Sequence, residues 1–187
     1  RAGALQWARD PGNPVRPGLP PAGQSYTRGT PNAWAPMAFD LALGSVYVVT
    51  GNATPDYWGG ERTALDDKYS SSVIALDLET GRPRWNFQTV HHDLWDFDNA
   101  SPPSLVTLRR DSRVIPVVLQ GTKTGMLFVL NRETGVPVFP VEERPVPASD
   151  VPGERASPTQ PFSALRLSPH RLSADDAWGL TPADRAW

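Results

Sequence analysis

The densest group of chemically active side chains lies at residues 91–98, which read HHDLWDFD. Two histidines and three carboxylates within eight residues can form the metal site of a hydrolase, or a general base with supporting groups. They can equally form a structural corner, in which aspartate and histidine cap turns and satisfy backbone amides. Taken alone, the string favours the corner, because carboxylates are common in turns.

Three further side chains lie beside turn residues elsewhere in the chain. Trp34 stands between prolines at positions 31 and 36, where its indole can form a platform for a flat ring or simply fill the core. Asn52 follows an apolar run and can offer its amide oxygen to a hard cation such as calcium, or start a turn. Lys123 lies between Gly121 and Gly125, either as a solvated charge or as a contact to an anionic cofactor.

Short apolar runs bounded by turn residues must position these side chains. Residues 45–50, 72–77, 114–119 and 126–130 are rich in β-branched and apolar residues, which predicts strands of an antiparallel sheet. No segment keeps a helical period, and the best candidate for a helical turn is residues 173–178, which Ser173 can cap. Residues 8–36 and 140–161 are rich in proline and glycine. Their aromatic residues favour ordered loops over linkers.

An internal repeat indicates the architecture. Residues 75–85 (ALDLETGRPRW) align with residues 129–139 (VLNRETGVPVF), and residues 3–7 match the end of the same unit. Each copy predicts a hairpin with an Asp or Asn that accepts bonds from turn amides, and with Gly81 or Gly135 at positive φ. The aromatic residue that ends each copy can pack against the next unit. Repeated hairpins of this kind favour blades of a β-propeller over a chance similarity.

Composition excludes several classes of protein. The 18 basic and 20 acidic side chains give a net charge of -2, which argues against binding nucleic acid through bulk electrostatics. The 21 prolines and 15 glycines exclude a helical bundle, and the lack of cysteine excludes disulfides and thiolate metal sites. No apolar run is long enough to cross a bilayer. The chain begins at Arg1 without a signal-peptide pattern, and we expect an internal fragment of a longer protein.

Longer motifs resemble the membrane-bound quinoprotein dehydrogenases of the glucose/quinate/shikimate family. The matching segments are WAPMAFD at 34–40, GNATPD at 51–56, KYSSS at 68–72, QTVHHDLWD at 88–96, KTG at 123–125, PTQPF at 158–162 and WG at 178–179. The resemblance covers essentially the whole chain, and HHDLWD is its most specific part. It implies an all-β fold that is part of an eight-bladed β-propeller, with about three blades and long loops. Residues 1–187 would then be a fragment of a single propeller catalytic domain that binds pyrroloquinoline quinone (PQQ).

The resemblance also implies an activity, namely oxidation of an aldose by hydride transfer to PQQ. The favoured reaction is the oxidation of D-glucose to gluconolactone. A bound Ca²⁺ or Mg²⁺ ion and electron transfer to ubiquinone belong to the same expectation. The implied site residues are Asp96 as the general base, Lys123 as a contact to the quinone, Trp34 stacked on its ring, and Asn52 with Asp96 as metal ligands. His91, His92 and Asp93 would shape the pocket wall.

Full-length members of this family carry membrane helices before a catalytic domain on the periplasmic side of the bacterial inner membrane. Membrane attachment through segments outside residues 1–187 is therefore expected. The alternative is a non-catalytic propeller scaffold that binds other proteins, although a scaffold has no use for an indole, a carboxylate and an amine on three loops. A weaker alternative is a hydrolase with a metal at residues 91–93. Because a closed ring needs roughly 40–55 residues per blade, we expect the isolated segment to be unstable and inactive.

Overall fold

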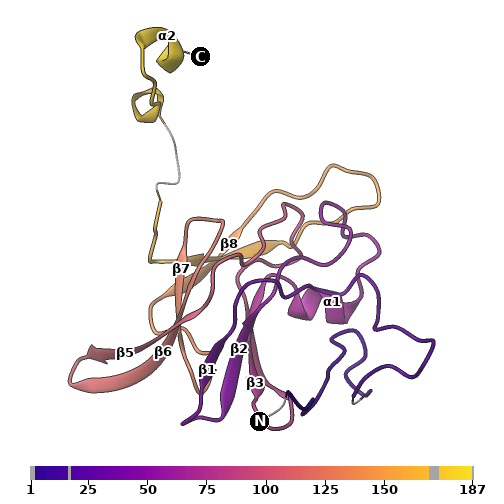
Figure 1. Ribbon diagram of the computed structural model, residues 1–187. Coiled ribbons are helices and arrows are strands. Elements are labelled where there is room, and N and C mark those ends of the chain that lie inside the picture. The colour runs from indigo at the N-terminus through magenta and orange to yellow at the C-terminus, as the bar shows by residue number, and fades with distance from the viewer. Residues whose placement is uncertain (1–2, 17, 169–172, 187) are drawn as a thin grey trace.

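The computed structural model describes residues 3–16, 18–168 and 173–186 (Figure 1). Their regular structure consists mainly of antiparallel strands, which form sheets of four, three and two strands. The first sheet has the order β1 (Ala38–Asp40), β2 (Ser45–Val49), β3 (Ser72–Asp77) and β4 (Pro83–Gln88). The second contains β5 (Ser104–Arg110), β6 (Arg113–Gly121) and β7 (Leu127–Asn131), and the third contains β8 (Val141–Pro145) and β9 (Thr159–Ser163). The all-β prediction is confirmed.

The four strands predicted from apolar runs are confirmed as β2, β3, β6 and β7. The prediction of an irregular loop over residues 140–161 was wrong at both ends, because β8 and β9 pair there. Val141 and Phe162 from these strands pack against the hydrophobic core. A two-stranded ribbon therefore forms where the frequency of proline suggested none, since one apolar side chain from each strand packs against the core.

Helical structure is limited to α1 (Ala64–Tyr69), η1 (Ala174–Asp176) and α2 (Pro182–Ala186) within the described part of the chain. Sequence analysis missed α1, which is too short to show a period. Its start is fixed by a capping box, in which Thr63 and Asp66 exchange hydrogen bonds between side chain and backbone. The turn predicted at 173–178 is confirmed as the 3-10 helix η1. No helix among the described residues combines the length and hydropathy that a membrane span requires.

The turns of the repeat share one structure. Asp77 and Asn131 each accept hydrogen bonds from the backbone N–H groups two and three positions later. Gly81 and Gly135 follow at φ values of 66° and 73°, in the left-handed region that glycine adopts without strain. The two hairpins predicted from the sequence are therefore built in the same way.

The aromatic residues of the first two copies, Trp7 and Trp85, dock on the turn of the next copy, as predicted. Trp7 packs on Gly81 and Trp85 packs on Gly135, and each indole N–H donates to a carbonyl of that turn, at 2.9 Å and 3.0 Å. The fit is close, since a Cβ added to Gly135 would lie 2.7 Å from Cδ2 of Trp85. This docking relates successive sheets to one another in the way that propeller blades require.

The hydrophobic core lies between the first and second sheets. Its buried residues include Tyr47, Val49, Val73 and Ala75 on one side and Val118, Met126, Phe128 and Leu130 on the other. Polar bonds close the same junction, because the Tyr47 hydroxyl and the Trp85 indole both donate to the carbonyl of Arg132 at 3.0 Å. The Arg132 guanidinium in turn pairs with Asp40 at 2.7 Å. The two sheets therefore hold the loops at their ends in a fixed relation.

Candidate active site

The segments that follow β2, β4 and β6 meet at one edge of the sheets. Both β2 and β4 are antiparallel to β3, so they run in the same direction and end at the same edge. Backbone bonds extend this pairing past the strand ends, from Ser71 N–H to the Gly51 carbonyl at 2.9 Å and from Thr89 N–H to the Ser71 carbonyl at 2.8 Å. The loops that carry three of the candidate residues are thereby brought together.

Asp96 and Lys123 form a pair that crosses from the first sheet to the second. Lys123 Nζ donates to the Asp96 carbonyl at 2.9 Å and lies 3.5 Å from Asp96 Oδ2. It also lies 3.7 Å from Asp98 Oδ2. The Asp96 and Lys123 side chains are 32% and 37% exposed, so a ligand can reach both. The structure therefore places the predicted base and the predicted cofactor contact in one site.

A buried carboxylate shapes the loop that carries Asp96. Asp93 is fully buried, and its Oδ1 accepts the Trp95 N–H at 2.9 Å. Its Oδ2 accepts the Phe97 N–H at 2.8 Å and the Ser71 hydroxyl at 2.7 Å. Burial raises the pKa of Asp93, although these three hydrogen bonds act in the opposite direction. Asp96 itself has a φ of 57°, which aspartate tolerates better than most residues.

Asn52 is buried and its side-chain amide organises the turn after β2. Nδ2 donates to the carbonyls of Asp56 at 2.7 Å and Asp93 at 3.0 Å, and Oδ1 accepts the N–H of Ala53 at 2.9 Å. The backbone N–H of Asn52 donates to the Asp98 carboxylate. The amide therefore holds a turn, as one of the two interpretations expected. The residue is only 2% exposed, so the fold itself uses this amide.

Trp34 does not belong to the core, since 56% of the residue is exposed. It lies between Asn32, whose carbonyl accepts the Gly51 N–H at 2.9 Å, and Ala35, which is buried in the core. These neighbours bring Trp34 to the edge at which Asn52 lies. Among the described residues, no hydrogen bond or ring contact joins Trp34 to the Asp96–Lys123 pair, so the predicted stacking role of Trp34 stays a prediction.

The side chains of residues 91–93 diverge toward different partners. His91 Nε2 lies 3.0 Å from Glu143 Oε1, whereas His92 is buried, with Nδ1 2.7 Å from Asp67 and Nε2 3.3 Å from Glu154. In the part of the chain that the structure describes, no three His, Cys, Asp or Glu residues are grouped to hold a metal ion. Asp93 satisfies backbone amides, as the corner interpretation expected, whereas the two histidines pair with carboxylates.

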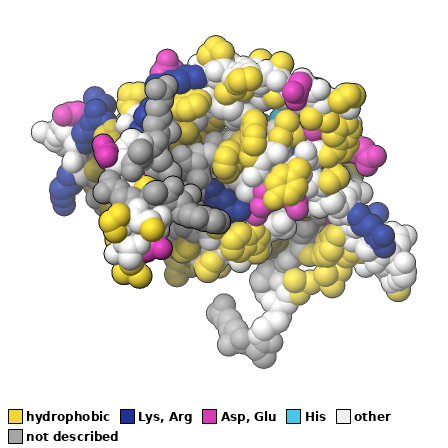
Figure 2. Space-filling view, turned by 90° about the horizontal axis from the view of Figure 1, so that it is seen from above, with side chains coloured by type: hydrophobic (Ala, Val, Ile, Leu, Met, Phe, Trp, Pro, Cys, Tyr) yellow, Lys and Arg dark blue, Asp and Glu magenta, His cyan; other side chains and the backbone are white. Residues whose placement is uncertain are grey.

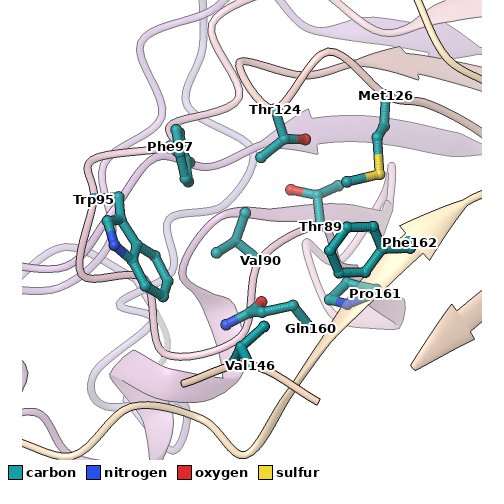
Figure 3. Close-up of a pocket in the computed structure, with 10 residues that line it drawn as sticks. All are labelled: Thr89, Val90, Trp95, Phe97, Thr124, Met126, Val146, Gln160, Pro161 and Phe162. Carbon is teal, nitrogen blue, oxygen red and sulfur yellow. The ribbon is translucent and has the colours of Figure 1, made fainter. Parts of the chain in front are cut away.

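An apolar cavity of about 300 Å³ lies beside the pair (Figure 3). It is lined by Thr89, Val90, Trp95, Phe97, Thr124, Met126, Val146, Gln160, Pro161 and Phe162. Trp95 and Phe97, which flank Asp96 in the chain, stand with ring centroids 6.0 Å apart. Figure 2 shows hydrophobic side chains gathered over much of the face seen from above, with acidic side chains between them. The charged pair is therefore bordered by an apolar wall.

Two further residues lie at this edge, Asp98 and Arg62, to which sequence analysis assigned no specific role. Asp98 stands in the HHDLWDFD string, so the density of carboxylates there was a signal for it. Arg62 is partly buried and donates to the carbonyls of Asp93 and Pro55. Burial lowers the pKa of Arg62, and nearby carboxylates, that of Asp93 first, oppose this. No spacing in the sequence indicated Arg62.

The hairpins joined by docked indoles are typical of a β-propeller, and an amine and carboxylates lie together at one edge of it. The family model described as "Glucose/ethanol/alcohol dehydrogenase, beta-propeller domain" (PQQ) matches residues 1–187. The chain belongs to this family of PQQ-dependent dehydrogenases, and the predicted family, fold and cofactor are confirmed.

Individual proteins of known sequence or structure resemble the chain over most of its length. The chain is 45% identical over 190 residues to quinoprotein glucose dehydrogenase A of Acinetobacter calcoaceticus, covering 98% of this chain and 24% of the relative. It is 46% identical over 179 residues to a probable quinate dehydrogenase (quinone) of Xanthomonas campestris pv. juglandis, covering 94% and 23%. The crystal structure of quinohemoprotein alcohol dehydrogenase from Comamonas testosteroni matches with a TM-score of 0.52 at 26% identity, over 80% of this chain and 21% of that chain. The chain thus spans about a quarter of the length of these relatives.

Proposed function

We propose that residues 1–187 form part of the catalytic domain of a PQQ-dependent dehydrogenase that oxidises D-glucose to gluconolactone and passes the electrons to ubiquinone. The observation that carries this proposal is the Asp96–Lys123 pair, in which a carboxylate and an ammonium from two sheets meet in a partly exposed site. Glucose is favoured as the substrate because three relatives of 41–45% identity over 98% of the chain are named glucose dehydrogenases, although a relative of 46% identity is named a glycerol dehydrogenase. Its close competitor is quinate, the substrate named for a relative of equal similarity.

The side chains at this edge fit PQQ and a hard cation. Lys123 would contact a carbonyl oxygen of the flat anionic quinone, and the exposed indole of Trp34 would stack on its ring. The Asp96 carboxylate and the amide oxygen of Asn52 are oxygen donors of the type that Ca²⁺ and Mg²⁺ take. Since the described residues hold no complete ligand group, further ligands would come from other parts of the complete protein.

Each residue of the site then has a defined task. When bound, PQQ supplies a carbonyl carbon that accepts hydride from the sugar. Asp96 would accept the proton of the sugar hydroxyl as the hydride leaves the sugar carbon that bears it, and could release the proton to solvent because Asp96 is partly exposed. The ammonium of Lys123 stabilises the negative charge that develops on the acceptor oxygen. Trp95 and Phe97 keep water from the apolar side of the site.

We further propose that the complete protein works at the periplasmic side of the bacterial inner membrane. The family resemblance supports this location, with attachment through segments outside residues 1–187. Nucleic acid is not an expected partner, because the net charge of -2 offers no excess of cations for phosphates.

The test is Asp96→Asn in the complete protein, loaded with PQQ and Ca²⁺ and assayed by dye reduction with glucose. Loss of the base is expected to lower turnover by about 10²–10⁴-fold, while PQQ still quenches tryptophan fluorescence with nearly unchanged affinity. Asp111→Asn is the control, because that carboxylate is 85% exposed on the turn between β5 and β6, and its turnover should match the wild type. Full turnover of Asp96→Asn would refute the assignment, and a lack of quenching in the wild type would favour the scaffold.

A further inference from the structure

The position of Asp96 is set by groups on either side of it rather than by its own side chain. The N–H groups of Trp95 and Phe97, its two neighbours, both donate to the carboxylate of Asp93, at 2.9 Å and 2.8 Å. The Trp95 N–H donates to Oδ1 and the Phe97 N–H donates to Oδ2. The backbone before and after Asp96 is thus fastened to a single planar group, and the left-handed backbone of Asp96 lies between the two bonds.

Asp93 is itself anchored to the strand ends that form the site. Its Oδ2 also accepts the hydroxyl of Ser71 at 2.7 Å, next to the start of β3. Its backbone carbonyl accepts Nδ2 of Asn52 at 3.0 Å and a guanidinium N–H of Arg62. The residue is 0% exposed, so it cannot contact a sugar or a cofactor. Its influence on chemistry must act through the loop.

We infer that Asp93 is a positioning residue, which fixes the carboxylate of Asp96 at the distance from Lys123 that proton and hydride transfer need. The inference rests on the proposed role of Asp96 as the base. A base misplaced by about 1 Å costs on the order of 10²-fold in rate, so the fastening of this loop has a measurable consequence.

The geometry requires two acceptor oxygens at position 93. An asparagine there keeps the size of the side chain but has only one oxygen. If its Nδ2 occupied the place of Oδ2, a donor would face the Phe97 N–H and the Ser71 hydroxyl, and in the flipped orientation it would face the Trp95 N–H. In either orientation one backbone N–H beside Asp96 loses its hydrogen bond. Asp93→Asn therefore removes a restraint on the loop that carries Asp96, while the Asp96 carboxylate itself is retained.

Asp10 provides a matched control. It is also buried, and its carboxylate also accepts three bonds, from the Gly12 N–H at 3.0 Å and from the N–H and hydroxyl of Thr27, both at 2.9 Å. Asp10→Asn therefore removes an equivalent acceptor from the N-terminal segment. A loss that is merely structural should be similar in the two variants, whereas a positional effect should be confined to Asp93→Asn.

The experiment is rapid mixing of the complete protein, loaded with PQQ and Ca²⁺, with glucose in the absence of an electron acceptor, so that the absorbance reports reduction of the cofactor directly. For Asp93→Asn the limiting reduction rate should fall by about 10–100-fold, while the half-saturating glucose concentration and the PQQ affinity change by less than about threefold. Asp10→Asn should keep the wild-type reduction rate even where it lowers the melting temperature equally.

Two results would overturn the inference, namely a wild-type reduction rate in Asp93→Asn or an equal loss of rate in Asp10→Asn. If Asp93→Asn fails to fold, Ser71→Ala removes one bond to the same carboxylate and should slow reduction by a few-fold; an unchanged rate there counts against the inference. Failure of the proposed function has a different signature. If Asp96→Asn keeps full turnover, the base assignment falls and the inference with it, whereas an inactive Asp96→Asn beside a fully active Asp93→Asn refutes the inference alone.

Discussion

Replacement of Gly135 by alanine should destabilise the junction between the first two sheets by about 3 kcal/mol. Gly135 has a φ of 73°, where an alanine costs roughly 1–2 kcal/mol. The added Cβ would also lie 2.7 Å from Cδ2 of Trp85. The indole cannot retreat freely, because it donates to the Arg132 carbonyl and packs on Tyr47 at a centroid distance of 5.9 Å. Overpacking of this kind adds about 1–3 kcal/mol.

Two comparisons separate these contributions. Gly44→Ala is the matched control, since Gly44 has a φ of 58° but its added Cβ would meet only the flexible end of Arg84, at 3.6 Å. It should cost about 1–2 kcal/mol, the conformational part alone. In a Trp85→Ala background, Gly135→Ala should likewise cost only about 1–2 kcal/mol, because the ring that it strikes is gone.

The assay is urea unfolding of the complete protein, followed by circular dichroism, for the wild type, the single variants and the double variant. A coupling free energy of about 1–2 kcal/mol between positions 85 and 135 is expected. If Gly135→Ala costs the same with and without the indole, or no more than Gly44→Ala, the docking of one unit on the turn of the next is not a close fit and the reasoning fails.

Three further predictions address the site and the turns. Lys123→Met should weaken PQQ binding by about 10–100-fold, because a charged hydrogen bond contributes about 1.5–3 kcal/mol; unchanged quenching of tryptophan fluorescence would contradict this. Removal of Ca²⁺ by a chelator should abolish glucose-dependent dye reduction, and added Ca²⁺ should restore it, whereas activity that persists after chelation would argue against Asn52 and Asp96 as ligands. Hydrogen bonds from Arg84 and Thr80 lower the pKa of Asp77 below its usual 3.8, so the charged form stabilises the fold above that value and this stabilisation is lost as the pH falls. The difference in unfolding free energy between the wild type and Asp77→Asn should therefore shrink between about pH 5 and pH 2, and a difference that grows with acidity would refute the sign.

The repeat and its docking aromatics could be predicted because they depend on local chemistry. An Asp or Asn that binds turn amides, followed by a glycine at positive φ, is legible in the sequence around Gly81 and Gly135. The strands β1, β5, β8 and β9 were not predicted; β8 and β9 are short and contain proline, and Val141 and Phe162 from them pack against the core. That surface exists only after the other sheets have assembled, so no local pattern could indicate it.

The candidate site was legible in part for the same reason. The side chains of Asp96, Lys123 and Asn52 were singled out from motifs, and the structure brings all three to one edge. The task of Asp93 could not be read, because it depends on which backbone groups face each oxygen. The bonds of Arg62 to carbonyls in two loops likewise depend on how those loops fold together.

The 3.5 Å distance between Lys123 Nζ and Asp96 Oδ2 spans the junction between the first and second sheets. The amine is borne by one blade and the carboxylate by its neighbour, so neither blade alone determines the gap. A slight sliding of the blades at Trp85 or Arg132 would open or close it without touching either group. If the pair acts as proposed, substitutions at Trp85 or Arg132 should therefore change the reaction rate, although neither residue belongs to the site.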